Sequence, residues 1–515
     1  MPSATTTRGG PEPGREARAG RRAPGVYGLE HELGLSITPA EALCCPPGAS
    51  RAAAMLALGG YPGLNSSAAQ YLANGGRLYV DCGEHPEYAT PECATPQELL
   101  AADSAGVALL DATARRAEAA LAEESGLDVR VRLLRNNSAP NGESWGAHEN
   151  YLVTSELSGA ELAEPLASHL ASRVCVVGAG TVLAGGDQPA GRFRLSQRAP
   201  FVTCVRASSA VSAAQAKPMA LCRDEPLANP QRYRRLQIAC GDANMAETST
   251  LLKIGATAIC LRLVQSGAAP TLSLDDPVRA LNAFSGDEEL AVTVRTSRGR
   301  LRAVDLQWIW LEAAAAHHET HGLPADEAEV LTLWELVLTE LEADPERLVD
   351  RLDWVAKRRL LRAVAERRGL PLDHPSALAV DLTYHDVRAD RSLYGGLVRA
   401  GKMRTVAAPD AVLRLRDAPP RTTRAALRGE LVRRLAQCGL THELNWAHWR
   451  TVGDELELSV DLSNPFAAST EQGRLALARL REFSENRRQA RAAAEGSLIT
   501  LDMAALWPEL AADAA

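Results

Sequence analysis

The sequence has few aromatic residues, no long apolar run and no paired cysteine motif. Aromatic residues make up only 4% of the 515 residues, in a background rich in Ala, Arg and Leu. No apolar run approaches the roughly 18 residues that a membrane helix needs, so we expect no membrane partner. The ten cysteines include no C-x-x-C pair that could form a zinc or redox site, which indicates a cytoplasmic protein with reduced thiols.

The charge and the length narrow the class of protein further. A net charge of -8 argues against a general nucleic-acid-binding surface. A chain of 515 residues favours one large domain with an appendage. We expect a disordered tail over residues 1–25, a large domain over residues 26–408, a small C-terminal domain over residues 409–480 and a helical tail over residues 481–515.

The densest group of polar residues lies between residues 77 and 93. Arg77, Tyr79 and Asp81 alternate with apolar residues, so an extended strand would place all three on one face. The chain then turns and offers two more carboxylates, Glu87 and Glu92. One face of this strand can therefore be buried while the other presents a cation, a phenol and a carboxylate to a cleft.

Two further stretches repeat this pattern. Glu30 and Glu32 have the i, i+2 spacing that points two side chains the same way on a strand, and so do His148 and Asn150. Two parallel carboxylates in one cleft repel each other unless a cation lies between them. A divalent metal ion is the simplest way to relieve that repulsion.

Several long motifs together carry a family resemblance. They are the E-x-E strand, the R-L-Y-x-D-x-x-x-H-P-E-Y-A-T-x-E-C block, H-E-N-Y-L, L-S-Q-R, R-D-E-P, Y-R-R-L and G-D-A-N. From about Gly28 to about Pro465 the chain resembles the Pup ligase and depupylase family, whose tag Pup is a small, disordered, ubiquitin-like protein of actinobacteria. The resemblance implies an α+β, glutamine-synthetase-like large domain with a curved antiparallel sheet cradling the active site, packed helices, and a small C-terminal domain that contributes to the nucleotide site.

The resemblance also implies a magnesium site. Glu30, Tyr79 and Glu87 match the family's Mg²⁺ ligands, and Glu32 and His148 fit a second or third metal position. Carboxylates with a phenol or an imidazole suit a hard cation held together with ATP phosphates. The alternatives are a solvated edge strand for the glutamates and a hydrogen-bonded histidine in the cleft wall for His148.

ATP is the second cofactor that the resemblance implies. Arg77 and Thr90 match positions that contact ATP, and Trp446 matches an aromatic residue at the nucleotide. Three arginines are expected to neutralise a transferring phosphoryl group, namely Arg198, Arg223 and Arg235. Core packing is the alternative for Trp446, and an exposed helix start is the alternative for Arg235.

Asp81 is the expected catalytic residue. In the ligases, the matching aspartate is thought to take a proton from the incoming lysine amine after ATP has activated the C-terminal glutamate of Pup as an acyl phosphate. In the depupylases it is implicated in attack on the isopeptide bond. The alternative for Asp81 is a carboxylate that is hydrogen-bonded to Arg77.

The chain departs from the family pattern at several positions, including Leu227 and Gln237, where the family usually has histidine. Losing imidazoles near a metal and phosphate site changes its charge and its proton-transfer capacity. This favours a diverged, depupylase-like phosphatase that hydrolyses phosphate esters of a small molecule or protein. The alternatives are an ATP-dependent Pup ligase, then a depupylase or Pup deamidase, with Pup or pupylated proteins as partners, and finally a silent ATP-binding regulator.

Overall fold

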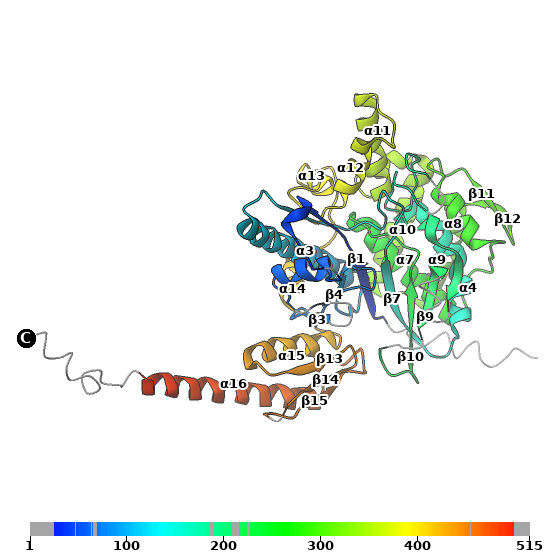
Figure 1. Ribbon diagram of the computed structural model, residues 1–515. Helices are drawn as coiled ribbons and strands as arrows, with labels where there is room; N and C mark the ends of the chain where they lie inside the picture. Colours follow the sequence, from blue (N-terminus) through cyan, green and yellow to red (C-terminus); the bar gives the residue numbers. More distant parts are fainter. Residues whose placement is uncertain are drawn as a thin grey trace, which may run out of the picture.

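The computed structural model describes residues 25–46, 48–62, 64, 69–185, 189–207, 216–223, 227–453 and 455–498 (Figure 1). Apart from Gly25, the predicted tail over residues 1–25 lies outside this part of the chain. No helix of the described residues is long and apolar enough to span a bilayer.

One sheet organises the larger body. Its strands lie in the order β3 (Ala69–Tyr71), β4 (Arg77–Val80), β5 (Pro86–Ala89), β1 (Tyr27–Glu32), β7 (Ala147–Thr154), β10 (Tyr233–Ile238), β9 (Pro218–Arg223) and β8 (Cys204–Ala207). All neighbouring strands are antiparallel except β8 and β9. The strands predicted around Glu30, Arg77 and His148 are therefore confirmed; β1 and β7 are neighbours, and β5 lies between β4 and β1.

Helices make up most of the rest of the body. They are α2 (Arg51–Leu58), α3 (Pro96–Ser125), α4 (Gly159–Ser172), α5 (Val174–Val177), α7 (Glu247–Ser266), α8 (Pro277–Ser285), α9 (Ala303–His321), α10 (Ala325–Ala343), α11 (Asp353–Arg368), α12 (Pro375–Tyr384), α13 (Leu393–Arg399) and α14 (Pro409–Asp417). Two small antiparallel pairs complete it, β2 (Gly34–Thr38) with β6 (Arg130–Leu134) and β11 (Thr293–Thr296) with β12 (Gly299–Arg302).

Helix α3 supports the sheet from behind. It begins at Pro96, because the Thr95 hydroxyl accepts a hydrogen bond from the Glu98 amide and proline is tolerated in the first helical turn. Gly106 lets α3 approach β5 closely, since a Cβ atom there would lie 2.2 Å from Tyr88 Cε1. This contact fixes the distance between the helix and the strand that carries Glu87.

The polar residues on the covered face of the sheet are paired. His31 lies 3.1 Å from Asp103 of α3, and Asp103 also pairs with Arg135. Glu149 of β7 forms a two-bond ion pair with Arg173, whose side chain is 3% exposed. These buried charges are compensated within the core, as burial requires. The opposite face of the sheet is left for the functional site.

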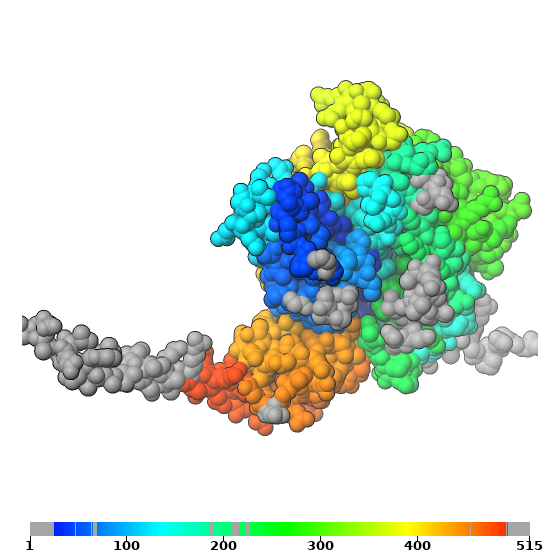
Figure 2. All heavy atoms as spheres, in the orientation of Figure 1, coloured from blue at the N-terminus to red at the C-terminus, as the bar shows by residue number. Residues whose placement is uncertain are grey.

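A C-terminal lobe lies beneath the larger body, shown in orange in Figure 2. It contains α15 (Ala425–Cys438), β13 (His442–Leu444), β14 (His448–Thr451), β15 (Ser459–Asp461) and α16 (Glu471–Leu498), which projects beyond the body in Figure 1. Its apolar core includes Leu431, Trp449 and Leu480. The predicted domain boundaries stay predictions; α14, at the start of the predicted small domain, packs against α3.

Candidate functional site

Strand register gathers the predicted polar residues on the open face of the sheet. Tyr79 lies opposite Glu87, and Glu87 lies opposite Glu32 on the next strand. Glu30 lies opposite His148 in the same way. Because side chains two residues apart share a face, these four strands, β4, β5, β1 and β7, contribute to one polar surface.

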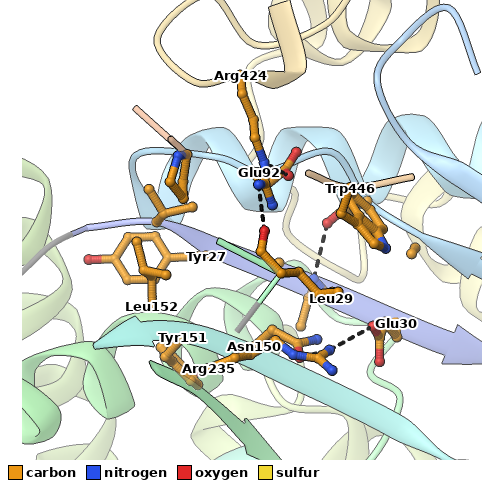
Figure 3. A pocket seen from close by; sticks show the side chains of 16 residues that line it. Tyr27, Leu29, Glu30, Glu92, Asn150, Tyr151, Leu152, Arg235, Arg424 and Trp446 are labelled. Carbon is orange, nitrogen blue, oxygen red and sulfur yellow. Dashed lines mark hydrogen bonds and ion pairs between the residues drawn. The ribbon is translucent and has the colours of Figure 1, made fainter. Parts of the chain in front are cut away.

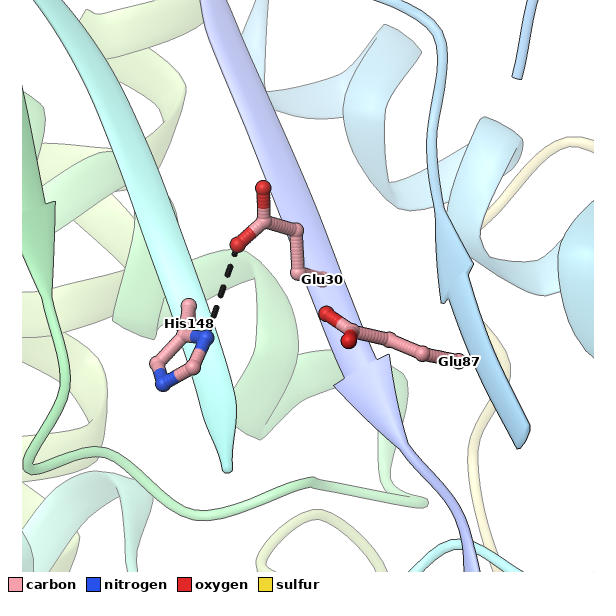
Figure 4. Close-up of side chains that lie close together, drawn as sticks. All are labelled: Glu30, Glu87 and His148. Carbon is pink, nitrogen blue, oxygen red and sulfur yellow. Dashed lines mark ion pairs between the residues drawn. The ribbon is translucent and has the colours of Figure 1, made fainter. Parts of the chain in front are cut away.

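Glu30, Glu87 and His148 form the centre of this surface, which Figure 4 shows at close range. One ligand atom from each of them lies within 4.8 Å of the others. His148 Nδ1 is 3.4 Å from Glu30 Oε2, and Gln237 Nε2 donates a hydrogen bond of 3.0 Å to the same oxygen. Two carboxylates and an imidazole at this spacing are a donor set that a divalent cation can use.

The electrostatics of the cluster are unfavourable without a cation. Burial, together with Glu30 and Glu32, raises the pKa of Glu87 well above its ordinary value. Burial and Glu87 likewise raise the pKa of Tyr79, so the Tyr79 phenol remains protonated and shares a hydrogen bond with Glu87. The strands therefore hold acidic groups where they repel each other, which is the expected property of a metal site.

Asp81 lies in a tight turn at the edge of the cluster. Asp81 Oδ1 accepts a hydrogen bond of 2.6 Å from the His85 amide, and the Asp81 amide donates to the His85 carbonyl. The His85 ring stacks on Trp145 with a centroid separation of 4.7 Å. Burial raises the pKa of Asp81, and the Glu32 carboxylate adds to that rise. The turn fixes the Asp81 carboxylate beside Glu32.

A largely apolar pocket adjoins the cluster, and Figure 3 shows the side chains around it. Its wall includes Glu30, Thr90, Arg235 and Trp446, so two of the residues predicted to contact ATP come together here with one arginine predicted for the phosphoryl group. The Thr90 hydroxyl accepts a hydrogen bond from the Leu29 amide, which orients it toward β1. Arg235 lies on β10 with its guanidinium 3.7 Å from Glu30, so it is part of a strand and not a helix start.

The remaining predicted arginines have other surroundings. The guanidinium carbon of Arg77 lies 4.3 Å from the centre of the Tyr79 ring. Arg198 is buried, and its guanidinium donates to Ser144 Oγ and to the carbonyls of Trp145 and Ala239. Arg223 ends β9, but its side chain lies outside the described part of the chain.

Sequence reasoning missed two arginines at this site. Arg424 and Arg428 come from the C-terminal lobe and bind the Glu92 carboxylate of the larger body. In the sequence they lie in an arginine-rich stretch of the predicted small C-terminal domain. Their partner is more than 330 residues away, and no spacing rule relates positions so far apart.

The fold and the site define an α+β enzyme of glutamine-synthetase-like fold, as expected from the sequence. A family model described as Pup-ligase protein matches residues 46–450, and the chain belongs to the Pup ligase family.

Two relatives and two solved structures give the extent of the similarity. The chain is 38% identical over 456 residues to a Pup–protein ligase of Acidimicrobium ferrooxidans, covering 88% of this chain and 98% of the relative. It is 37% identical over 406 residues to a Pup–protein ligase of Nakamurella multipartita, covering 78% and 88%. The ligase PafA in complex with Pup has a TM-score of 0.81 at 30% identity, covering 93% of this chain and 96% of that chain. PafA in complex with ADP has a TM-score of 0.74 at 32% identity, covering 81% and 90%.

These similarities correct the leading functional prediction. The phosphatase acting on phosphate esters is wrong, because the relatives are Pup–protein ligases over most of this chain. The prediction gave too much weight to two missing imidazoles. In the structure Gln237 donates a hydrogen bond to Glu30, and Leu227 lines the apolar pocket. Both positions are thus accommodated while the carboxylate cluster is retained. The predicted phosphorylated partner has no support either.

Proposed function

We propose that this enzyme is an ATP-dependent ligase that joins the C-terminal glutamate of Pup to a substrate lysine through an isopeptide bond. One observation carries the proposal: Glu30 belongs both to the carboxylate cluster and to the wall of the apolar pocket. A nucleotide in the pocket would therefore have its phosphates beside the cluster. The ligase relatives, and the solved ligase in complex with ADP, support this assignment.

Glu30, Glu87 and His148 are the proposed Mg²⁺ ligands, with Glu32 and Tyr79 next to them. The mutual repulsion of the carboxylates fits a cation between them. When bound, Mg²⁺ would neutralise charge on the ATP phosphates.

The apolar pocket is the proposed site of the nucleoside. Trp446 offers a ring for stacking, and the apolar neighbours Val26, Leu152 and Leu227 suit a base more than a phosphate. Thr90 and Arg235 lie on the side of the pocket that adjoins β1. Arg77, Arg198 and Arg223 are proposed to supply positive charge for the transferring phosphoryl group.

Asp81 is the proposed general base. Transfer of the γ-phosphoryl group to the Pup carboxylate produces an acyl phosphate and ADP. The lysine amine then attacks the acyl carbon, phosphate leaves, and Asp81 takes the proton that the amine loses. Because burial and Glu32 raise the pKa of Asp81, it is a stronger base than an exposed carboxylate.

The Asp81→Asn variant tests this assignment. It should lower the rate of conjugation by about 100-fold or more, since general-base catalysis contributes on that order. ADP affinity should be unchanged, because Asp81 does not line the pocket. The control is Glu84→Gln, the same loss of one charge at an exposed position of the same turn. Unchanged conjugation by Asp81→Asn would remove Asp81 from the mechanism.

A further inference from the structure

The C-terminal lobe is joined to the larger body by a buried cluster of charges, which we call the joint: Glu92, Arg424 and Arg428. Arg424 Nε lies 2.7 Å from Glu92 Oε1, and Arg428 Nη1 lies 3.0 Å from the same oxygen. Arg428 Nη2 contacts the other carboxylate oxygen. Their side chains are only 12%, 5% and 0% exposed, respectively. Two cations thus surround one carboxylate at the contact between the two bodies.

The remaining donors of these arginines bind main-chain carbonyls. Arg424 Nη1 donates to Leu227 on the larger body and to Leu462 in the lobe. Arg428 Nη2 donates to the carbonyl of Gly75, at 2.7 Å. The two side chains therefore tie three separate segments of the larger body to the start of α15.

The lobe has an apolar core of its own. Its apolar cluster is made of residues between Leu427 and Leu480, and among the described residues no apolar residue of the larger body belongs to it. An interface without a shared apolar core permits relative motion of the two bodies. Docking therefore depends on the charged joint together with two aromatic contacts across the same boundary, Trp446 with Tyr71 and Phe466 with Tyr233.

The joint is also part of the pocket wall. Glu92, Arg424 and Leu227 line the pocket together with Trp446, as Figure 3 shows for the labelled residues. The Arg428 guanidinium lies 4.6 Å from the centre of the Trp446 ring, and that ring meets Tyr71 edge to face at 5.3 Å. The pocket is therefore complete only when the lobe is docked, because Trp446 and Arg424 come from the lobe.

The joint stays charged in neutral solution. Burial alone would raise the pKa of Glu92, but Arg428 and Arg424 outweigh it and hold the pKa at about 2. The carboxylate is ionised at every pH at which the enzyme would be assayed, so changes in nucleotide affinity near neutral pH cannot come from titration of Glu92.

We propose that Glu92, Arg424 and Arg428 couple nucleotide binding to docking of the C-terminal lobe. A ligand that contacts both bodies binds the docked state more tightly, so it must also stabilise docking by the same factor. This inference rests on the proposed ATP site. It assigns Arg428 a positioning role, because Arg428 acts on the pocket through Trp446 and Glu92.

The first test uses hydrogen exchange of the whole protein with and without ADP. Bound ADP should slow exchange of amides at the start of α15 and around Trp446, whereas amides of α11, remote from the joint, should not change. Binding of ADP is measured by calorimetry in the same samples. ADP binding without slower exchange in the lobe would overturn the coupling while leaving the ATP site intact. Absence of ADP binding would overturn both.

The second test is Arg428→Met, which keeps the length of the side chain and removes its charge. ADP affinity should fall by about tenfold, within the usual range of coupling between sites, and the loss should appear in the KM for ATP more than in kcat. The matched control is Arg434→Met on the same helix, where the arginine forms a partly exposed pair with Glu430 and lies outside the joint. Equal effects of the two variants would refute the proposal.

A double variant separates coupling from misfolding. If Glu92 and Arg428 act together, the loss of ADP affinity in Glu92→Gln/Arg428→Met should be smaller than the sum of the two single losses. Additive losses would overturn the coupling. Unchanged exchange in α11 of every variant checks that the larger body remains folded.

Discussion

Replacing Glu87 with glutamine should change protein stability in opposite directions with and without magnesium. The Glu87 carboxylate is 4% exposed and lies opposite Glu32 and close to Glu30. Glutamine keeps the shape of the side chain and removes its charge. Without metal the variant should be the more stable protein, whereas with Mg²⁺ it should lose a ligand and gain less from the ion.

The size of the effect follows from the spacing. Two unit charges 4.8 Å apart repel by about 3.5 kcal/mol at an effective dielectric constant of about 20. The pKa of Glu87 is higher in the folded protein than in the unfolded chain, so the folded state holds the proton more tightly. The stability that this proton contributes is complete below the unfolded pKa of about 4.3 and is lost as pH rises through the folded pKa. The advantage of Glu87→Gln should thus be small near pH 4 and largest at alkaline pH, where it approaches about 3 kcal/mol.

Urea unfolding at several pH values, in EDTA and in Mg²⁺, measures this effect. The parent protein should lose stability in EDTA as pH rises and recover it in Mg²⁺, since an ion that binds only the folded state stabilises that state. In EDTA, the free energy of unfolding of the Glu87→Gln variant should depend less on pH than that of the parent protein. Glu84→Gln, at an exposed position of the neighbouring turn, is the control. A Glu87→Gln variant that is less stable than the parent in EDTA at pH 8 would refute the reasoning.

Two further substitutions test the pocket and the support of the sheet. Trp446→Ala should raise the KM for ATP by about tenfold with a smaller change in kcat, since stacking of a base on an aromatic ring is worth about 1–3 kcal/mol. The exposed His448→Ala variant is the control and should leave the KM unchanged. An unchanged KM in Trp446→Ala would exclude Trp446 from the nucleotide site. Arg173→Met should lower the free energy of unfolding by about 3–5 kcal/mol, because the buried Glu149 carboxylate loses the cation that pairs with it and keeps the hydrogen bond from the Tyr151 hydroxyl. The double variant Arg173→Met/Glu149→Leu should recover most of that loss in urea unfolding, and a double variant as unstable as the single one would contradict the explanation.

Local patterns predicted the strands of the site well. Alternation of polar and apolar residues identified β1, β4 and β7, because one face of each strand packs on helices and the other is open. The same alternation placed Glu30 with Glu32, and His148 with Asn150, on shared faces. Strand order was not contained in those patterns, and it was the order that brought Glu87 next to Glu32 and Glu30 next to His148.

Interactions between distant parts of the chain were the main omission. Glu92 was recognised as a carboxylate, but its pairing with Arg424 and Arg428 depends on how the lobe docks. The functional prediction failed for a related reason. The prediction considered only the imidazoles that Leu227 and Gln237 replace. In the structure, Leu227 lines the pocket and Gln237 donates a hydrogen bond to Glu30.

The most direct test of the proposed ligase activity follows the products of a single reaction. Purified protein is incubated with ATP, Mg²⁺, Pup and a lysine-containing protein, with a phosphoserine ester present as a competing substrate. The account predicts Pup conjugates, with one ADP and one phosphate formed for each isopeptide bond and with the ester intact. Phosphate released from the ester without any conjugate would contradict it.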